Sequence, residues 1–367
     1  MGEVMQRMRN DITKVKEINV EMITSALKRS GEATKAQIAE ETGISVATCG
    51  KILNELCASG EVIETTQTSA GYGRPAMCYA YNGNFAFVAC IYVASDRGKS
   101  YISTTVNNLL GEVLREYVRE LDHIDFDVLE QAVAELTDKY EKLRSVAIGI
   151  PGYITDGVVD ICNFAGLMGL PLHDMLQEKF PKLRIQVEND MNAVAYGFYK
   201  RDYSEKETTV AFIYSPVNAQ TGLEHLDYSE LNDAQRTLVQ YSINCGAGFV
   251  SGGKILRGFS GFAGEVSFLP IVRELASKNE NTSVETMAYI IGSIVPVLNP
   301  ETIALTGSYF DEDKLKDIRE KCLKLITPKH MPQIILLDDI HEEYVNGLLN
   351  LALEELSCGI MLVTQKA

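Results

Sequence analysis

The chain has 367 residues, which is long enough for two or three domains with hydrophobic cores of their own. It contains 34 Lys and Arg against 50 Asp and Glu, a formal charge of −16, and such an acidic chain does not bind nucleic acid through its overall charge. Residues 1–82 hold nine basic and ten acidic side chains, so almost all of the negative charge belongs to the remaining residues. DNA contact is therefore expected only in the N-terminal segment, acting in two copies as a homodimer or a dimer of dimers.

Cysteine and histidine usage indicates a cytoplasmic protein without a metal site. The eight cysteines are scattered without a C-x-x-C pair, and none of the five histidines has a zinc-like spacing to a cysteine. No apolar leader opens the chain, and the longest apolar run, residues 85–94, is too short to span a bilayer. We expect no membrane segment and no cofactor.

Residues 34–56 have the pattern of a helix-turn-helix. Ala39 lies four positions before Gly43, and two crossing helices need a small side chain at their contact and a glycine where the turn takes a positive φ. After the turn, one face repeats apolar residues at i, i+3, i+4 and i+7: Cys49, Ile52, Leu53 and Leu56. The opposite face of this recognition helix would meet DNA, and the candidate contacts are Lys35, Ser45, Ala47, Thr48 and Lys51.

A β-hairpin wing is predicted after the second helix. Val62–Thr66 and Ala76–Tyr81 are rich in strand-forming residues, and the segment between them, residues 69–75, has the glycines and proline of a turn. Arg74 at the tip is positioned to contact a phosphate or a narrow minor groove. The alternative is a three-helix domain whose hairpin mediates only protein contacts.

From residue 83 the sequence alternates between strands and helices, which predicts an α/β body of two similar lobes. The first lobe is expected over residues 83–193 together with the C-terminal helix, and the second over 194–345. Strands are predicted at 87–95, 101–107, 113–119, 146–150, 185–187, 210–215, 238–243, 303–306 and 334–337, and helices at 128–141, 192–199, 284–298, after 311 and from 342.

Several motifs occur in an order that resembles the ROK family of sugar-responsive repressors and bacterial sugar kinases. The resemblance implies an actin/hexokinase-like ATPase fold behind the winged helix-turn-helix at residues 1–82. The motifs are Gly73-Arg-Pro75, Gly149-Ile-Pro-Gly152, the segment 163–172, Val187-Glu-Asn-Asp-Met-Asn-Ala193, Gly246-Ala-Gly248 leading to Gly253-Lys254, Arg257-Gly-Phe-Ser-Gly-Phe-Ala-Gly-Glu265, and Asn299-Pro-Glu-Thr-Ile303 before Gly307.

The resemblance implies a sugar site at Asn163, Asn189, Asp190 and Glu265. In the family's kinases the aspartate position accepts a proton from the sugar hydroxyl, so Asp190 would be a vestigial base. Two readings without ligand binding stay open. Asn189 and Asp190 are also residues that cap a following helix, and Glu265 is also typical of a solvated turn.

The chain departs from the family at both phosphate turns. Asp96-Arg-Gly-Lys-Ser100 has bulky side chains where small residues allow backbone N–H groups to approach phosphate, which favours a plain hairpin turn. Ser242-Ile-Asn-Cys-Gly246 lacks the expected threonine and two glycines, and so loses a hydroxyl donor and close backbone approach. Both changes argue against ATP binding and catalysis.

The family's zinc region is also absent. Phe268 stands where a histidine is expected three residues after Glu265, and no cysteine follows before Cys322. A polar, acidic insertion at about 217–236 is expected to form a loop or flap.

Together these features predict a transcriptional regulator, expected to be a repressor, that binds an operator in double-stranded DNA and senses a sugar or sugar phosphate. One alternative is an active sugar kinase with an appended DNA-binding module. The other is a regulator controlled by a protein partner.

Overall fold

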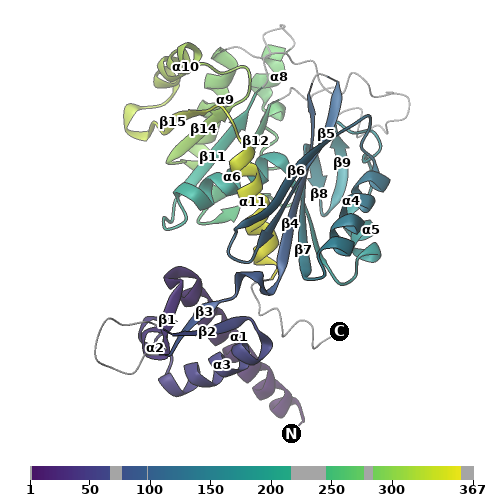
Figure 1. Cartoon of the computed structure of the whole chain (residues 1–367). Coiled ribbons are helices and arrows are strands. Elements are labelled where there is room, and N and C mark those ends of the chain that lie inside the picture. The colour runs from purple at the N-terminus through teal and green to yellow at the C-terminus, as the bar shows by residue number, and fades with distance from the viewer. Residues whose placement is uncertain (1, 67–76, 97, 216–244, 277–283, 357–367) are drawn as a thin grey trace.

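The computed structural model describes residues 2–66, 77–96, 98–215, 245–276 and 284–356. A small N-terminal domain lies below a larger body built around two β-sheets (Figure 1). The predicted insertion at 217–236 and the predicted strand at 238–243 lie outside the described residues.

The N-terminal domain is a winged helix-turn-helix, as predicted. Gly43 caps the first helix of the motif with φ 69°, and the apolar stripe of the second helix is buried. A capping box at Thr34 and Gln37 begins the first helix, since each side chain satisfies the other residue's backbone N–H. The elements are α1 (Gly2–Ser30), β1 (Glu32–Thr34), α2 (Lys35–Thr42), α3 (Val46–Ser59), β2 (Val62–Thr66) and β3 (Met77–Tyr81), and the sheet order is β1-β3-β2.

A short, packed connection joins this domain to the body. The backbone N–H of Asn82 donates to Glu61 O at 2.9 Å, and its side chain donates to Gly60 O at 2.8 Å. Tyr81 ends β3 beneath the Lys28 ammonium, which lies 4.4 Å from the ring centroid. One apolar core therefore continues from the N-terminal domain into the body.

The two lobes repeat one sheet topology. In each, an antiparallel three-strand meander is followed by two parallel strands, of which the first pairs with the first strand of the meander and the second pairs with that added strand. The first sheet, in the order β10-β7-β4-β5-β6, consists of β4 (Phe87–Asp96), β5 (Lys99–Asn108), β6 (Val113–Leu121), β7 (Leu143–Ile150) and β10 (Arg184–Asn189). The second, in the order β13-β12-β11-β14-β15, consists of β11 (Thr209–Tyr214), β12 (Gly246–Ser251), β13 (Lys254–Ile255), β14 (Thr302–Thr306) and β15 (Gln333–Leu337).

The structure adds elements that the sequence did not predict, among them the helix α1, a hairpin of β8 (Gly152–Thr155) and β9 (Val158–Cys162), and the helices α5 (Leu172–Lys179) and α8 (Pro270–Ala276). The predicted helices and the described predicted strands form, with ends moved by a few residues. The remaining helices are α4 (Phe126–Lys139), α6 (Asp190–Asp202), α9 (Val284–Leu298), α10 (Glu312–Leu325) and α11 (His341–Glu354), with 3-10 turns η1 (Gly83–Phe85), η3 (Val266–Phe268) and η4 (Pro328–His330).

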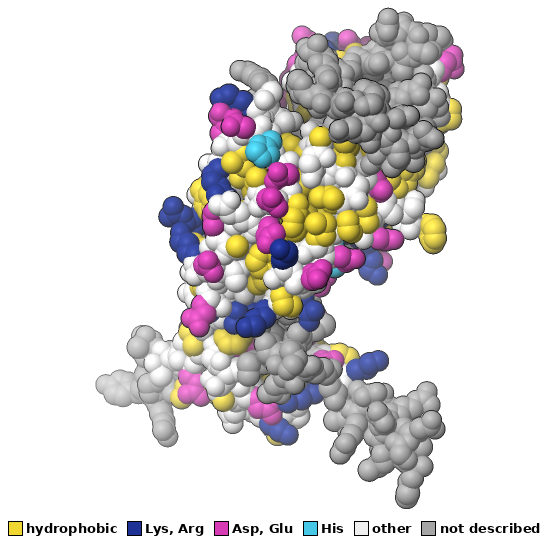
Figure 2. All heavy atoms as spheres, turned by 90° about the vertical axis from the view of Figure 1, so that its right-hand side faces the viewer, with side chains coloured by type: hydrophobic (Ala, Val, Ile, Leu, Met, Phe, Trp, Pro, Cys, Tyr) yellow, Lys and Arg dark blue, Asp and Glu magenta, His cyan; other side chains and the backbone are white. Residues whose placement is uncertain are grey.

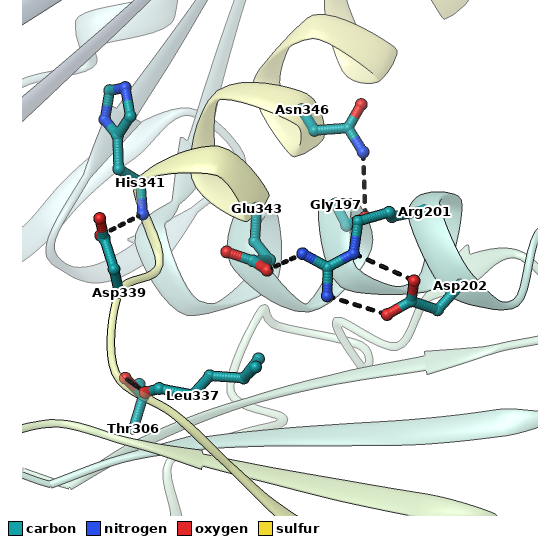
Figure 3. Close-up of polar contacts among 9 residues, drawn as sticks. All are labelled: Gly197, Arg201, Asp202, Thr306, Leu337, Asp339, His341, Glu343 and Asn346. Atoms are coloured by element: carbon teal, nitrogen blue, oxygen red, sulfur yellow. Dashed lines mark hydrogen bonds and ion pairs between the residues drawn. The ribbon is translucent and has the colours of Figure 1, made fainter.

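Two helices, α6 and α11, cross between the sheets with their backbones in contact (Figures 1 and 3). A Cβ atom added to Gly197 would lie 1.8 Å from Glu343 O, and one added to Gly347 would lie 1.9 Å from Ala193 O. Beside the crossing, Arg201 forms an ion pair with buried Glu343, as Figure 3 shows. Glycine is therefore required on both helices.

Replacing Gly197 by alanine should destabilise the protein by about 2 kcal/mol or more, because the new methyl group meets a carbonyl that cannot rotate away. Urea unfolding measures the loss. Gly292→Ala in α9 is the matched control, since its new Cβ would meet only the Leu325 side chain at 3.2 Å. Equal stability of the Gly197 and Gly292 variants would contradict the steric account.

Candidate functional site

The N-terminal end of α3 is the candidate DNA-contacting surface. Ser45 caps the helix, because its hydroxyl accepts from the Thr48 N–H at 3.2 Å and lies 2.9 Å from the Thr48 hydroxyl. Ser45, Ala47 and Lys51 are exposed. The backbone N–H groups of the first turn point out of the helix end, which favours a phosphate there.

Charge near this surface is sparse. Lys51 is exposed on α3, and Lys35 is partly buried, with its ammonium 3.0 Å from where a Cβ of Gly50 would lie. The sequence analysis overlooked Val46, a 54% exposed apolar side chain at the first position of α3 and therefore suited to a thymine methyl group. Arg74 lies outside the described residues.

A second polar cluster forms where β10 ends and α6 begins, around the buried carboxylate of Glu188. Arg257 donates to this carboxylate from its Nε at 2.9 Å, and the Asn192 amide donates to its other oxygen at 3.0 Å. The Asn189 backbone N–H also donates to it at 3.0 Å. Glu188 is thus fully engaged in holding other groups in place.

Asn189 is the N-cap of α6. Its side-chain oxygen accepts from the Asn192 N–H at 3.0 Å, while its amide donates to Gly152 O. The capping alternative that the sequence left open is therefore observed. Among the described residues, one amide N–H and one lone pair of this side chain have no partner and could bind a ligand.

Asp190 and Glu265 are the chemically distinctive pair. Each is partly exposed. The pKa of Asp190 is raised to about 7, mainly by desolvation and also by the charge of Glu265, while hydrogen bonds from backbone N–H groups, that of Met191 first, act to lower it. Desolvation likewise raises the pKa of Glu265 to about 7. The fold thus brings together two carboxylates that are 75 residues apart in sequence.

The fourth predicted residue, Asn163, is exposed just after β9. In the described part of the chain, no hydrogen bond joins it to Asn189, Asp190 or Glu265.

The segment 256–265 of the second lobe reaches the β8–β9 hairpin of the first. Tyr153 donates to Ser260 O at 2.9 Å, and its ring meets Phe262 edge to face at 5.6 Å. Phe262 in turn meets Phe268 at 5.0 Å. Sequence reasoning missed this aromatic row and the Arg257–Glu188 bridge, although Arg257 opens a motif it had quoted.

The first of the two turns at which the family binds phosphate, residues 96–100, lies in the hairpin between β4 and β5. In the first lobe Asp96 pairs directly with Lys99, whose ammonium forms an ion pair with Glu120 at 2.5 Å. This geometry is that of a plain hairpin turn. Residues 242–244 of the second turn lie outside the described ranges, while the next residue, Cys245, is buried.

Within the described ranges, no group of three or more His, Cys, Asp or Glu residues is arranged to hold a metal ion. Over the same residues, no helix is both long and apolar enough to cross a membrane.

On the face of the body in Figure 2, acidic and basic side chains are interspersed.

Comparison with known proteins agrees with this architecture. A family model described as ROK family matches residues 92–223, and one described as winged helix-turn-helix DNA-binding matches residues 21–62. The chain therefore carries a winged helix-turn-helix and a ROK-family domain.

A xylose repressor of Caldicellulosiruptor bescii is 24% identical over 270 residues, which are 71% of this chain and 60% of that protein. The chain thus matches less than two thirds of the length of this curated relative.

Two solved structures share the fold. A ROK family transcriptional regulator, a homologue of the Escherichia coli MLC protein, has a TM-score of 0.64 and 18% identity, covering 95% of this chain and 98% of its own. A ROK hexokinase from Thermus thermophilus has a TM-score of 0.55 and 16% identity, covering 74% of this chain and 100% of its own. The actin/hexokinase-like fold predicted for the ROK domain is confirmed.

The two carboxyl groups should give the ROK domain a stability that falls as pH rises. Their pKa values of about 7 exceed the ordinary 3.8 and 4.5, so between these values the folded chain binds protons that the unfolded chain has released. The stabilisation is complete below pH about 4 and is lost as pH rises through about 7. Asp190→Asn should flatten this decline and raise the melting temperature at pH 8.

Melting temperatures measured from pH 4.5 to 8 test this prediction. Glu178→Gln, at an exposed position of α5, is the control and should follow the unmodified protein. A decline in Asp190→Asn that runs parallel to the unmodified protein would rule out a desolvated carboxyl at this position.

Proposed function

We propose that this protein is a sugar-responsive transcriptional regulator of ROK type, expected to act as a repressor. The proposal is carried by two features that occur in one chain. The recognition helix α3 has an exposed, capped N-terminal end, and the ROK domain has two desolvated carboxyl groups, Asp190 and Glu265, where its lobes meet. The xylose repressor among its relatives and the regulator that shares its fold over most of its length support the same reading.

DNA binding is proposed to use α3 and the wing. Lys35, Ser45, Ala47, Thr48 and Lys51 supply the described part of this surface, with Val46 added from the structure, and Arg74 is the proposed contact at the wing tip. The acidic body contributes nothing favourable to phosphate binding, so the affinity depends on two such domains in a dimer.

Lys51→Ala should weaken binding and lower the salt slope by about one, because one phosphate contact is lost. A duplex selected from a random library by the full chain provides the DNA for titration at several salt concentrations. Lys324→Ala, exposed on α10, is the control and should leave both quantities unchanged. Undiminished affinity after deletion of residues 1–82 would refute the proposal.

Effector binding is proposed at Asn189, Asp190 and Glu265, with Asn163 at the edge. A sugar that enters the site loses the water bound to its hydroxyl groups. The site must therefore offer strong hydrogen-bond acceptors in place of that water, and two carboxylates do so. Neither phosphate turn has the small residues that cradle a triphosphate, so we propose that the ROK domain binds its sugar without phosphorylating it.

A panel of pentoses, hexoses, amino sugars and their phosphates should contain a ligand that raises the melting temperature. A ligand at 100 times its Kd adds about 2.7 kcal/mol to the free energy of unfolding. Asp190→Asn should abolish the response while Glu178→Gln retains it, and no phosphorylated sugar should form with ATP and Mg²⁺.

If no compound of the panel raises the melting temperature at millimolar concentration, the sugar-sensing claim is wrong and control by a protein partner is favoured. Phosphorylation that disappears in Asp190→Asn would instead establish a kinase.

A further inference from the structure

Three aromatic side chains lie at the border of the proposed effector site, and we call them the aromatic rim: Tyr153, Phe259 and Phe262. Phe259 is fully exposed, Phe262 is 37% exposed and Tyr153 is partly buried. Among the described residues, no other large apolar side chain is as exposed as Phe259. Such a side chain gains free energy when a ligand covers it and removes its apolar surface from water.

The loop that carries the two phenylalanines is held in one shape by contacts with the β8–β9 hairpin. Ser260 O, in this loop, accepts from the hydroxyl groups of Tyr153 and Thr155 at 2.9 and 3.2 Å. Gly261 has a φ of 75°, and a Cβ there would lie 2.6 Å from Ile154 O. The loop backbone therefore rests directly on the hairpin, and a ligand would find the rim already formed.

The aromatic rim is continuous with the residues proposed to hold the sugar. On the second lobe, the Glu265 N–H donates to Phe262 O at 3.3 Å. On the first lobe, Tyr153 follows Gly152, whose carbonyl accepts from the Asn189 amide. Each lobe thus contributes one part of the rim next to a residue of the effector site.

The rim and the carboxyl groups suit different parts of a saccharide. Carboxylates accept hydrogen bonds from the hydroxyl groups at the edge of a sugar ring, whereas the C–H groups on its face are apolar and pack on an aromatic ring. Asp190 and Glu265 lie where the protein removes water, while Phe259 is fully exposed. A ligand that contacts both must extend from the carboxyl groups to the surface, and one sugar ring is too short to do so.

We propose that the effector is a saccharide of at least two rings. Its first ring binds to Asn189, Asp190 and Glu265, and its second ring stacks on Phe259 and Phe262. The inference rests on the proposed effector site and adds the class of ligand. Hydrogen bonds at the first ring select the pattern of hydroxyl groups, and the aromatic contact selects the length of the saccharide.

Calorimetry of the full chain with matched pairs of saccharides tests the length of the ligand. The pairs are xylose with xylobiose, glucose with cellobiose and with maltose, and N-acetylglucosamine with its β-1,4-linked dimer. At least one disaccharide should bind about tenfold tighter than its monosaccharide, because an aromatic contact contributes roughly that factor.

Phe259→Ala should remove this preference. It should weaken binding of the disaccharide about tenfold and leave that of the monosaccharide within about twofold, because only the second ring touches the rim. Val297→Ala is the matched control, since Val297 is an exposed apolar side chain of α9, and it should change neither affinity.

A single tryptophan provides a direct reporter of the second ring. The chain contains no tryptophan, so Phe259→Trp introduces the only one and keeps a flat apolar ring at this position. Its fluorescence emission should move to shorter wavelength when the disaccharide binds, because the stacked ring excludes water. A saturating concentration of the monosaccharide should leave the emission unchanged.

Two kinds of failure are distinguishable. Equal affinity for a monosaccharide and its disaccharides, or an emission that a bound disaccharide does not change, would overturn the two-ring proposal while the effector site remained supported. If no saccharide of either length binds, the proposed effector site is wrong and the two-ring proposal is wrong with it.

Discussion

The backbone contact between α6 and α11 is the constraint on which the two-lobed body depends. α6 follows the last strand of the first sheet and leads into the second, while α11 follows the last strand of the second sheet, so their crossing joins both lobes. A further glycine, Gly248, brings α6 against β12, because a Cβ there would lie 2.1 Å from Met191 O. Backbone contacts do not adjust as side chains do, and they fix the start of α6 to both lobes.

That fixed start positions the polar groups of the site. Glu188 and Asn189 lie at the end of β10. Glu188 accepts hydrogen bonds from Arg257 and Asn192, and Asn189 donates to Gly152 O. Asp190, one residue further, keeps a carboxylate that burial and Glu265 disfavour in its charged form. Structural and ligand-facing roles are thus divided among three consecutive residues. A sugar hydroxyl donating to this carboxylate would offset part of the desolvation already present in the fold.

The same junction connects to the N-terminal domain through the first lobe. Arg257–Glu188 and Tyr153–Ser260 bridge the lobes, and β3 continues through η1 into β4 of the first sheet. Asn82 donates to Gly60 O just after α3, and Tyr81 lies beneath Lys28 of α1, so this connection is packed against the N-terminal domain.

The sequence by itself determined the local elements and their order. The stripe from Cys49 to Leu56, the turn at Gly43 and the apolar strands could be predicted because helix and strand periods are short-range properties of the chain. The motif order also gave the fold. The sequence did not predict the β8–β9 hairpin, because its strands are too short to show a clear period. It did not predict α1 either, because the apolar residues of that helix lie on two faces and give no single stripe.

Only the tertiary structure decided which side chains meet and which lose water. Asn189 has the same local sequence whether it caps a helix or holds a ligand. In the structure its side-chain oxygen accepts from the Asn192 N–H, so it caps α6, and its amide is turned to Gly152 O of a distant segment. The bridge from Arg257 to Glu188 and the pairing of Asp190 with Glu265 join segments about 70 residues apart. Desolvation depends on all atoms that surround a group in space, and these come from segments whose approach no local pattern records.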